Sequence, residues 1–130
     1  RRQRQMCIRD RYYAVDISLR NMLVKGSESD IGHILENIVY LELKRRGFNV
    51  YVGHLDDGEI DFVAVKDNDT VYYQVSATAL EENTLKRELA PLRKVQDNYP
   101  KYLLTLDEIF GSADYDGIKK INVLDWLLDK

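Results

Sequence analysis

Three polar side chains stand inside predicted strands, at positions where apolar residues would be expected. Asp61 lies in the run 58–65, and Gln74 and Ser76 lie in the run 70–78. A short polar turn joins these runs, which predicts a β-hairpin. Because side chains alternate along a strand, Gln74 and Ser76 share one face. A hairpin with such residues in mid-strand indicates a metal site, the remnant of one, or a sheet with a hydrated face.

The main helix upstream supplies two further acidic candidates. Apolar residues recur at helical spacing from Ile31 to Arg46, with Asp30 as the expected N-cap and Gly47 as the expected stop. By helical angle, Glu42 falls in the middle of the apolar face, whereas Glu36 falls at its edge. Periodicity alone therefore favours Glu42 as the acid that points inward.

The rest of the chain contains shorter predicted elements. A second helix is expected over 81–97, and Pro91 should kink or break it near Ala90, because proline removes a helical hydrogen bond and clashes with the preceding turn. The other expected elements are a strand at 12–16, a helix at 17–24, strands at 48–52, 101–106 and 121–123, an acidic loop at 111–117 and a terminal helical turn at 124–128.

The order of these elements predicts the fold class. Hairpin connections make antiparallel pairs, whereas the second helix can act as a crossover that makes a parallel pair. We therefore expect a three-layer α/β/α sandwich with a central mixed sheet, formed by residues 12–130 as a single domain.

Composition places the chain among ordinary globular proteins. Of the 130 residues, 45% are hydrophobic and 32% are charged, and no run approaches the roughly 18 apolar residues of a membrane span. The single cysteine, Cys7, cannot form an internal disulfide. No signal peptide is visible, so we expect a cytoplasmic protein without membrane contact.

The charge is distributed unevenly. Residues 1–11 hold five of the 19 basic residues and one of the 22 acidic residues, which leaves 14 against 21, or −7, for the rest. This opening segment reads either as translated sequencing-adaptor DNA, and thus an artefact, or as a disordered basic arm. Because Lys and Arg supply most non-specific affinity for nucleic acids, the acidic body favours a protein partner over nucleic acid.

The order and spacing of these motifs resemble a known family. The chain resembles the C-terminal domain of unknown function of prokaryotic AAA-type ATPases, which has a PD-(D/E)XK, or restriction-endonuclease-like, nuclease fold. The segments that carry the resemblance are 35–39, 43–48, 59–63, 74–76 and 97–102.

The resemblance implies roles for four positions. Glu36 matches the helix Glu and Asp61 the strand Asp that hold magnesium in active nucleases of this fold. Gln74 stands where the second strand carboxylate would be, and Ser76 stands where the lysine would be. Magnesium prefers clustered oxygen ligands, and the reaction also needs a cation near the developing negative charge. With two charges replaced, the resemblance implies a degenerate site, with Glu36 and Asp61 as its remaining metal ligands.

Three functions follow as hypotheses. The first is a non-catalytic accessory domain of an AAA-type ATPase that binds no cofactor and contacts a partner protein, its own ATPase domain or another subunit of an oligomer. The second is a nuclease with a rearranged site, in which magnesium binds and Lys86 replaces the missing lysine. The third is an oligomerisation domain.

The basic runs at 44–46 and 86–87 are either a nucleic-acid patch or solvated helix faces. No phosphate-binding loop is present in the sequence, so this chain alone should not hydrolyse ATP.

Overall fold

The structure of the protein, a computed structural model, describes residue 21 and residues 28–128. The predicted strand at 12–16, most of the predicted helix at 17–24, and the arm at 1–11 lie outside the described residues. The described elements are α2 (Glu28–Arg45), β1 (Asn49–Leu55), β2 (Gly58–Lys66), β3 (Asp69–Val75), α3 (Glu82–Lys94), β4 (Lys101–Thr105), β5 (Ala113–Tyr115), β6 (Ile118–Asn122) and α4 (Val123–Leu127).

The strands form one mixed sheet of six strands in the order β1-β2-β3-β4-β6-β5. β1, β2 and β3 pair antiparallel as a meander. α3 then crosses from β3 to β4, and these two strands pair in parallel, as expected for a helical crossover. β6 also lies parallel to β4, and β5 pairs antiparallel with β6 at the far edge.

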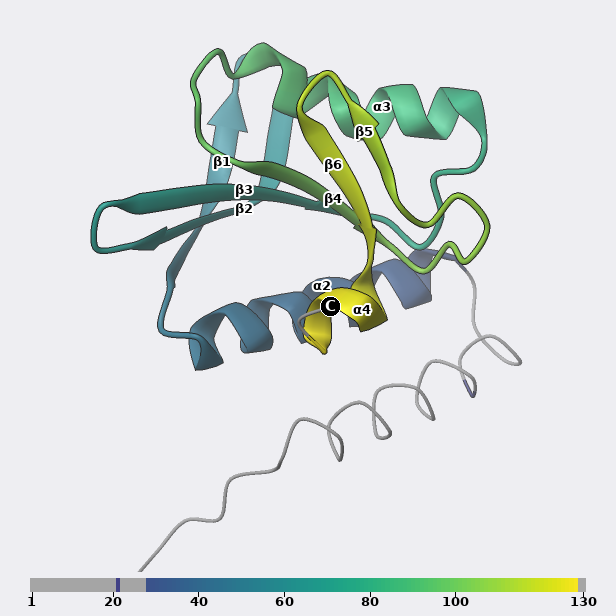
Figure 1. The fold of residues 1–130 in the computed structure, drawn as a ribbon, viewed down its shortest axis with the longest axis horizontal. Helices are drawn as coiled ribbons and strands as arrows, with labels where there is room; N and C mark the ends of the chain where they lie inside the picture. Colours follow the sequence, from purple (N-terminus) through teal and green to yellow (C-terminus); the bar gives the residue numbers. More distant parts are fainter. Residues whose placement is uncertain (1–20, 22–27, 129–130) are drawn as a thin grey trace, which may run out of the picture.

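The sheet is covered on both faces (Figure 1). α2 and α4 lie on one face, and α3 lies on the other. The first apolar core joins α2 and α4 to the sheet through residues such as Leu35, Leu104 and Trp126, and the second joins α3 to the sheet through Leu89 and Leu103. The predicted α/β class with a mixed sheet between helices is therefore confirmed.

α2 ends where the sequence predicts but begins earlier. Gly47 has φ +94°, and the Phe48 N–H donates to the carbonyl of Leu43 at 3.0 Å, as in a glycine-terminated helix end. The expected N-cap at Asp30 is wrong, because the helix already begins at Glu28 and contains Asp30 in its first turn. Good capping residues are also tolerated in the first turn, where a negative charge complements the helix dipole.

The predicted hairpin is confirmed as β2 and β3. Lys66 pairs with Asp69 across a two-residue turn, in which Asp67 has φ +54°. β3 ends at Val75, so Ser76 lies just beyond the strand rather than within it. β1 extends to Leu55, past the expected end at residue 52, because it continues to pair with the beginning of β2.

Two expectations about the C-terminal half are wrong. The predicted acidic loop at 111–117 contains β5, and the last strand covers Ile118–Asn122 instead of 121–123. Asp116 and Gly117 both have positive φ, as a type I′ hairpin turn requires, and they join β5 to β6. The Asp-Gly pair is the signal in the sequence that could have predicted this hairpin.

The expected break of α3 near Ala90 is also wrong. α3 runs through Pro91 to Lys94, although it ends before the predicted limit at residue 97. Arg87, whose carbonyl loses its helical donor to proline, is exposed, so water can satisfy that carbonyl.

A buried ion pair fixes the ends of the central strands. The Lys120 Nζ of β6 lies 2.8 Å from Asp107 Oδ2, and their side chains are 1% and 4% exposed. The Asp107 carboxylate also accepts hydrogen bonds from the Thr78 hydroxyl at 2.6 Å and the Ala79 N–H at 2.9 Å. Burial alone would raise the pKa of Asp107, but Lys120 and these donors hold it below its usual value. Asp107 thereby ties the segment after β3 to β6.

Replacing Lys120 by methionine should destabilise the fold strongly, because the Asp107 carboxylate would remain buried without its cation. We expect Lys120→Met to lower the free energy of unfolding by about 3 kcal/mol in urea denaturation at neutral pH. Lys119→Met, on the exposed neighbour in the same strand, is the matched control and should have little effect. Equal stability of the two variants would contradict a structural role for the pair.

Candidate functional site

The four candidate positions come from three elements around the end of β3. Asp61 lies in β2, Gln74 near the end of β3, Ser76 directly after it, and Glu36 in α2. The ladder between β2 and β3 runs to the pair Phe62–Tyr73. Beyond that pair, side chains connect the two strands.

Asp61 and Gln74 form a two-way bridge between these strands. The Asp61 N–H donates to Gln74 Oε1 at 2.6 Å, and the Val75 N–H donates to Asp61 Oδ2 at 2.9 Å. The Gln74 amide, 4% exposed, also donates from Nε2 to the carbonyl of Glu88 in α3 at 3.3 Å. The two side chains therefore accept hydrogen bonds from the backbone N–H groups of Asp61 and Val75, beyond the last pair of the β2–β3 ladder, and Gln74 also connects α3 to the sheet.

A β-bulge shapes this end of β2. Tyr51 pairs with Val63, but Gly53 pairs with Ile60, so Asp61 and Phe62 together stand opposite the single residue Val52. The extra residue belongs to β2. Such bulges bend a strand and redirect its side chains. The side-chain alternation expected for an ideal strand is interrupted here, since Ile60 and Val63 pack in the same core on the α3 side.

Burial and neighbouring carboxylates raise the pKa of two acids at this corner, Asp61 and Glu88. Burial raises the pKa of Asp61 to about 6, with the charges of Glu36, Glu88 and Glu59 adding to the rise and the Val75 N–H opposing it. Burial also raises the pKa of Glu88, as does Glu36, while Arg87 lowers it. The charge of Glu36 in α2 thus acts on both Asp61 in β2 and Glu88 in α3.

The two acids of α2 have different surroundings. Glu36 has a side chain that is 39% exposed, and its Oε2 lies 3.6 Å from His33 Nδ1. Glu42 is buried and accepts hydrogen bonds from Arg45 at 2.9 and 2.8 Å and from Arg46 at 2.8 Å. Burial would raise the pKa of Glu42, but the two arginines together hold it below its usual value. Arg46 also stacks on Trp126, 4.4 Å from the ring centroid.

The helical periodicity therefore identified Glu42, which is the buried acid. The family motif instead identified Glu36, whose charge acts on Asp61. Glu42 is bound by its own helix and has a structural role. Both histidines, His33 and His54, are exposed, and His54 Nδ1 lies 3.1 Å from Glu59 Oε2.

A small pocket of about 260 Å³ adjoins the bridge. It is lined by Gly32, Val75, Ser76, Ala77, Thr78, Thr84 and Arg87. The Ser76 hydroxyl donates to the carbonyl of Thr78 at 2.7 Å. Lys86, the replacement cation expected for a rearranged site, lies 3.1 Å from Glu82 and does not line this pocket. Arg87 is the cationic side chain among the residues that line the pocket.

Glu88 and Arg87 were not predicted from the sequence as members of this corner. Glu88 lies three residues after Leu85 and four before Leu92, within the apolar stripe of α3, and this spacing was the available signal. It places Glu88 towards the sheet, where it approaches Asp61 and Glu36.

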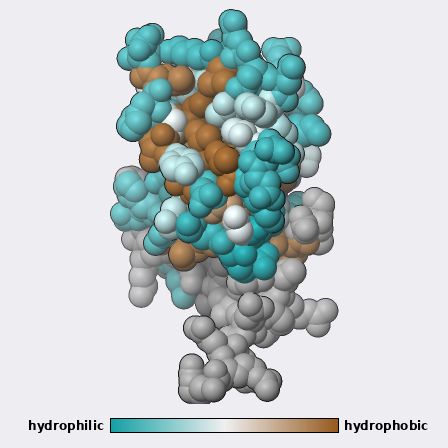
Figure 2. All heavy atoms as spheres, turned by 90° about the vertical axis from the view of Figure 1, so that its left-hand side faces the viewer, coloured by the Kyte–Doolittle hydropathy of each residue, from teal (hydrophilic) through white to brown (hydrophobic). Residues whose placement is uncertain are grey.

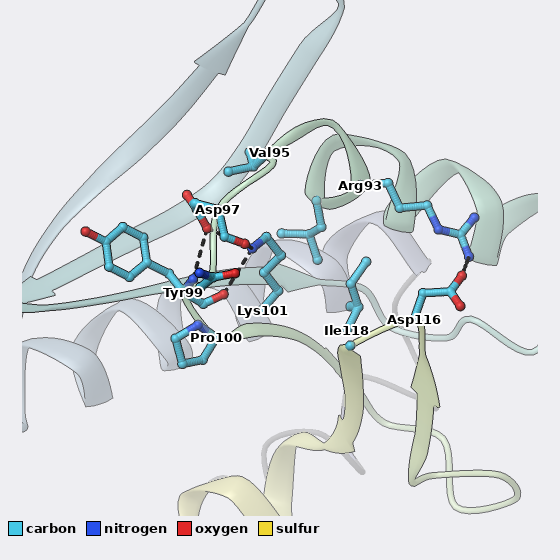
Figure 3. Close-up of a pocket in the computed structure, with 11 residues that line it drawn as sticks. Arg93, Val95, Asp97, Tyr99, Pro100, Lys101, Asp116 and Ile118 are labelled. Atoms are coloured by element: carbon cyan, nitrogen blue, oxygen red, sulfur yellow. Dashed lines mark hydrogen bonds and ion pairs between the residues drawn. The ribbon is translucent and has the colours of Figure 1, made fainter.

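The motif at 97–102 forms a separate hydrogen-bonded cluster (Figure 3). The Asp97 carboxylate accepts from Lys101 Nζ at 2.8 Å and from the Tyr99 N–H at 3.0 Å. It also accepts from the Tyr72 hydroxyl at 2.7 Å. Burial and Asp97 raise the pKa of Tyr72 to about 12. The cluster fixes the turn before β4 against β3 and borders a pocket of about 430 Å³. Tyr99 is 46% exposed.

Comparisons with known proteins give little functional information. An uncharacterised protein of Haemophilus influenzae is 42% identical over 118 residues, which cover 91% of this chain and 28% of that relative. The chain thus spans about a quarter of the length of the curated relative it matches. Neither a protein-family model nor a solved structure matches the chain. Among the described residues, no helix is long and apolar enough to cross a membrane.

Replacing Asp61 by asparagine tests the electrostatics of the corner. The pKa of Asp61 is about 6 in the folded protein against 3.8 for an ordinary Asp, so its contribution to stability is present below about pH 4 and is lost as the pH rises through 6. An asparagine side chain at this position would keep an acceptor for the Val75 N–H without the charge. We expect Asp61→Asn to be more stable than the native protein by about 1–2 kcal/mol near pH 8, and close to it near pH 4.

Urea denaturation across this pH range measures the difference, and Asp69→Asn, at an exposed position of the hairpin, serves as the control. A variant that is less stable than the native protein at both ends of the range would contradict the predicted cost of ionising Asp61.

Proposed function

We propose that this chain is a non-catalytic binding domain with a degenerate nuclease-like site, and that it serves as the C-terminal accessory domain of an AAA-type ATPase. One observation carries the proposal. Asp61 and Gln74, which match two of the metal-holding positions of the resembled fold, bind each other's strands instead. The proposal includes the cytoplasmic location expected from the single cysteine.

The donor set does not fit a bound magnesium ion as it is arranged. Gln74 Oε1 accepts the Asp61 N–H, and Asp61 Oδ2 accepts the Val75 N–H. Gln74 supplies only a neutral carbonyl oxygen, and Ser76 supplies no cation. Among residues 28–128, no group of three or more His, Cys, Asp or Glu side chains is placed to hold a metal ion. Metal-assisted hydrolysis would require these oxygens to leave the backbone donors they now satisfy.

The order of elements supports the nuclease-like part of the proposal. A helix with Glu36 precedes three antiparallel strands, the second with Asp61 and the third with Gln74, and α3 then leads to a parallel strand. The ATPase part is supported by the resemblance of the sequence motifs. It is also consistent with a matched relative that is much longer than this chain.

The charge of the corner supports a protein as the partner. The charges of Glu36 and Glu88 raise the pKa of Asp61, and Arg87 opposes only the rise at Glu88. A phosphate backbone would be repelled by these carboxylates, whereas basic or neutral protein surfaces would not. The partner would be another protein, the ATPase domain of the same protein or another subunit.

A metal-dependent nuclease with a rearranged site is the second candidate. Glu88 of α3 approaches Asp61 closely enough to raise its pKa, so it stands near the position of the lost strand carboxylate. Arg87, which lines the adjoining pocket, would take the place proposed for Lys86.

Nuclease assays separate the two functions. Because two of the four charges are replaced, we expect the purified protein to leave plasmid DNA uncut with magnesium or manganese. Calorimetry should show a magnesium dissociation constant weaker than about 1 mM. Cleavage that disappears in both Glu36→Ala and Glu88→Ala, but persists in Lys86→Ala, would overturn the proposal in favour of the rearranged nuclease.

Restoring the missing charges tests whether the scaffold is that of a nuclease. We expect the double variant Gln74→Glu/Ser76→Lys to bind magnesium at least about tenfold more tightly than the native chain, because a second carboxylate joins Asp61. Addition of Asp61→Asn should abolish this gain. A folded double variant without any gain, as judged by circular dichroism and calorimetry, would argue against a degenerate metal site.

A further inference from the structure

One edge of the sheet is long and uncharged, whereas the other is short. β1 has seven residues, none of them Lys, Arg, Asp or Glu, and it forms one edge. β5 forms the opposite edge with three residues that include Asp114. Edge strands expose unpaired backbone donors and acceptors, and proteins usually protect them by shortness, charge or bulges. Within the described part of the chain, β1 has none of these protections, because the extra residue of the neighbouring bulge belongs to β2.

Exposed apolar side chains accompany this edge. Tyr51 and Val52 are 58% and 51% exposed, far more than strand residues that are covered by a helix. Tyr40 of α2, itself partly exposed, packs against Phe62, which stands opposite Val52 at the bulge. Figure 2 views the side of the molecule where β1 lies and shows apolar atoms in a band between hydrophilic borders.

The two ends of β1 carry opposite charges. At its beginning lie Lys44, in the last turn of α2, and Lys66, which follows the ladder partner of Asn49 and donates to the carbonyl of Arg46 at 3.0 Å. At its end lies the exposed turn of Asp56 and Asp57, in which Asp57 is paired with Lys94 at 3.3 Å. Asp56 is therefore the charge at this end that the proposed contact uses.

We propose that two copies of this chain pair through β1 in an antiparallel arrangement with two-fold symmetry. Such an interface is isologous, so each copy presents the same patch to the other. The basic beginning of one β1 then meets the acidic end of the other, and Val52 lies near the axis. A parallel pairing would place like charges together and is disfavoured. The dimer joins the two sheets into one and buries the exposed side chains of Tyr51 and Val52.

This inference does not depend on the candidate site. Asp61 and Gln74 bridge β2 to β3, on the far side of β2 from the proposed contact. The nuclease and magnesium experiments therefore do not test whether the chain dimerises, and the dimerisation experiment does not test the proposed function.

Sedimentation velocity of the 130-residue chain tests the pairing. We expect a dimer whose population rises with concentration up to about 0.2 mM. Val52→Lys should be monomeric with an unchanged circular dichroism spectrum, because it introduces a charge beside its own symmetry mate. Hydrogen exchange should show amides of β1 that become protected as the dimer forms.

Charge reversal tests the antiparallel direction. Lys44→Glu and Asp56→Lys should each weaken dimerisation at least about tenfold, and the double variant should restore it. Lys119→Glu, which makes the same charge change on β6, is the control and should not weaken it. A monomer at about 0.2 mM would overturn the proposal, as would a dimer unaffected by Val52→Lys. A double variant without restored affinity would overturn the antiparallel arrangement.

Discussion

The bridge between Asp61 and Gln74 is the constraint on which this end of the sheet depends. After the Phe62–Tyr73 pair, the ladder between β2 and β3 gives way to side chains: Gln74 accepts from the backbone of β2, and Asp61 accepts from the backbone of β3. Buried backbone donors are costly when they are left without acceptors, so the acceptor oxygens of the two residues stabilise this end of the sheet. Because Gln74 also donates to the carbonyl of Glu88, the same bridge fixes the position of α3. The polar residues of these two strands thus have a structural role.

The architecture was predictable where one local signal dominated. Gly47 ended α2 as expected, and the strong β-forming runs on either side of the 66–69 turn formed β2 and β3. The crossover through α3 followed from chain order alone. The β5–β6 hairpin was missed because β5 is only three residues long and its acidic composition reads as a loop. Its Asp116-Gly117 turn was nevertheless a local signal. The Asp107–Lys120 pair had no such signal, since its partners lie far apart in the sequence and meet only through the sheet.

The site was predictable in its strand residues and less so in its helix residues. Asp61 and Gln74 are polar residues in apolar runs, and such positions demand a partner. The choice between Glu36 and Glu42 could not be made from periodicity, because an amphipathic pattern reports burial and not what a side chain faces. Glu42 is buried and neutralised by Arg45 and Arg46 at the end of its own helix, a pairing at spacings of three and four residues that the sequence contains. Glu88 approaches Asp61 through the packing of α3 on the sheet, to which the hydrogen bond from Gln74 contributes, and this is a tertiary effect.

Electrostatics then limit what this corner can bind. An active metal site keeps its carboxylates ionised, since the metal's charge compensates them. Here burial and neighbouring carboxylates raise the pKa of Asp61, so the corner reduces its charge by taking up a proton as the pH falls towards 6. A nucleic-acid backbone would add negative charge where the structure already disfavours it. A protein partner that brings a basic side chain would instead lower the pKa of Asp61 and recover the energy that its ionisation costs. The charge of this corner therefore favours contact with a cationic side chain over contact with an anionic group.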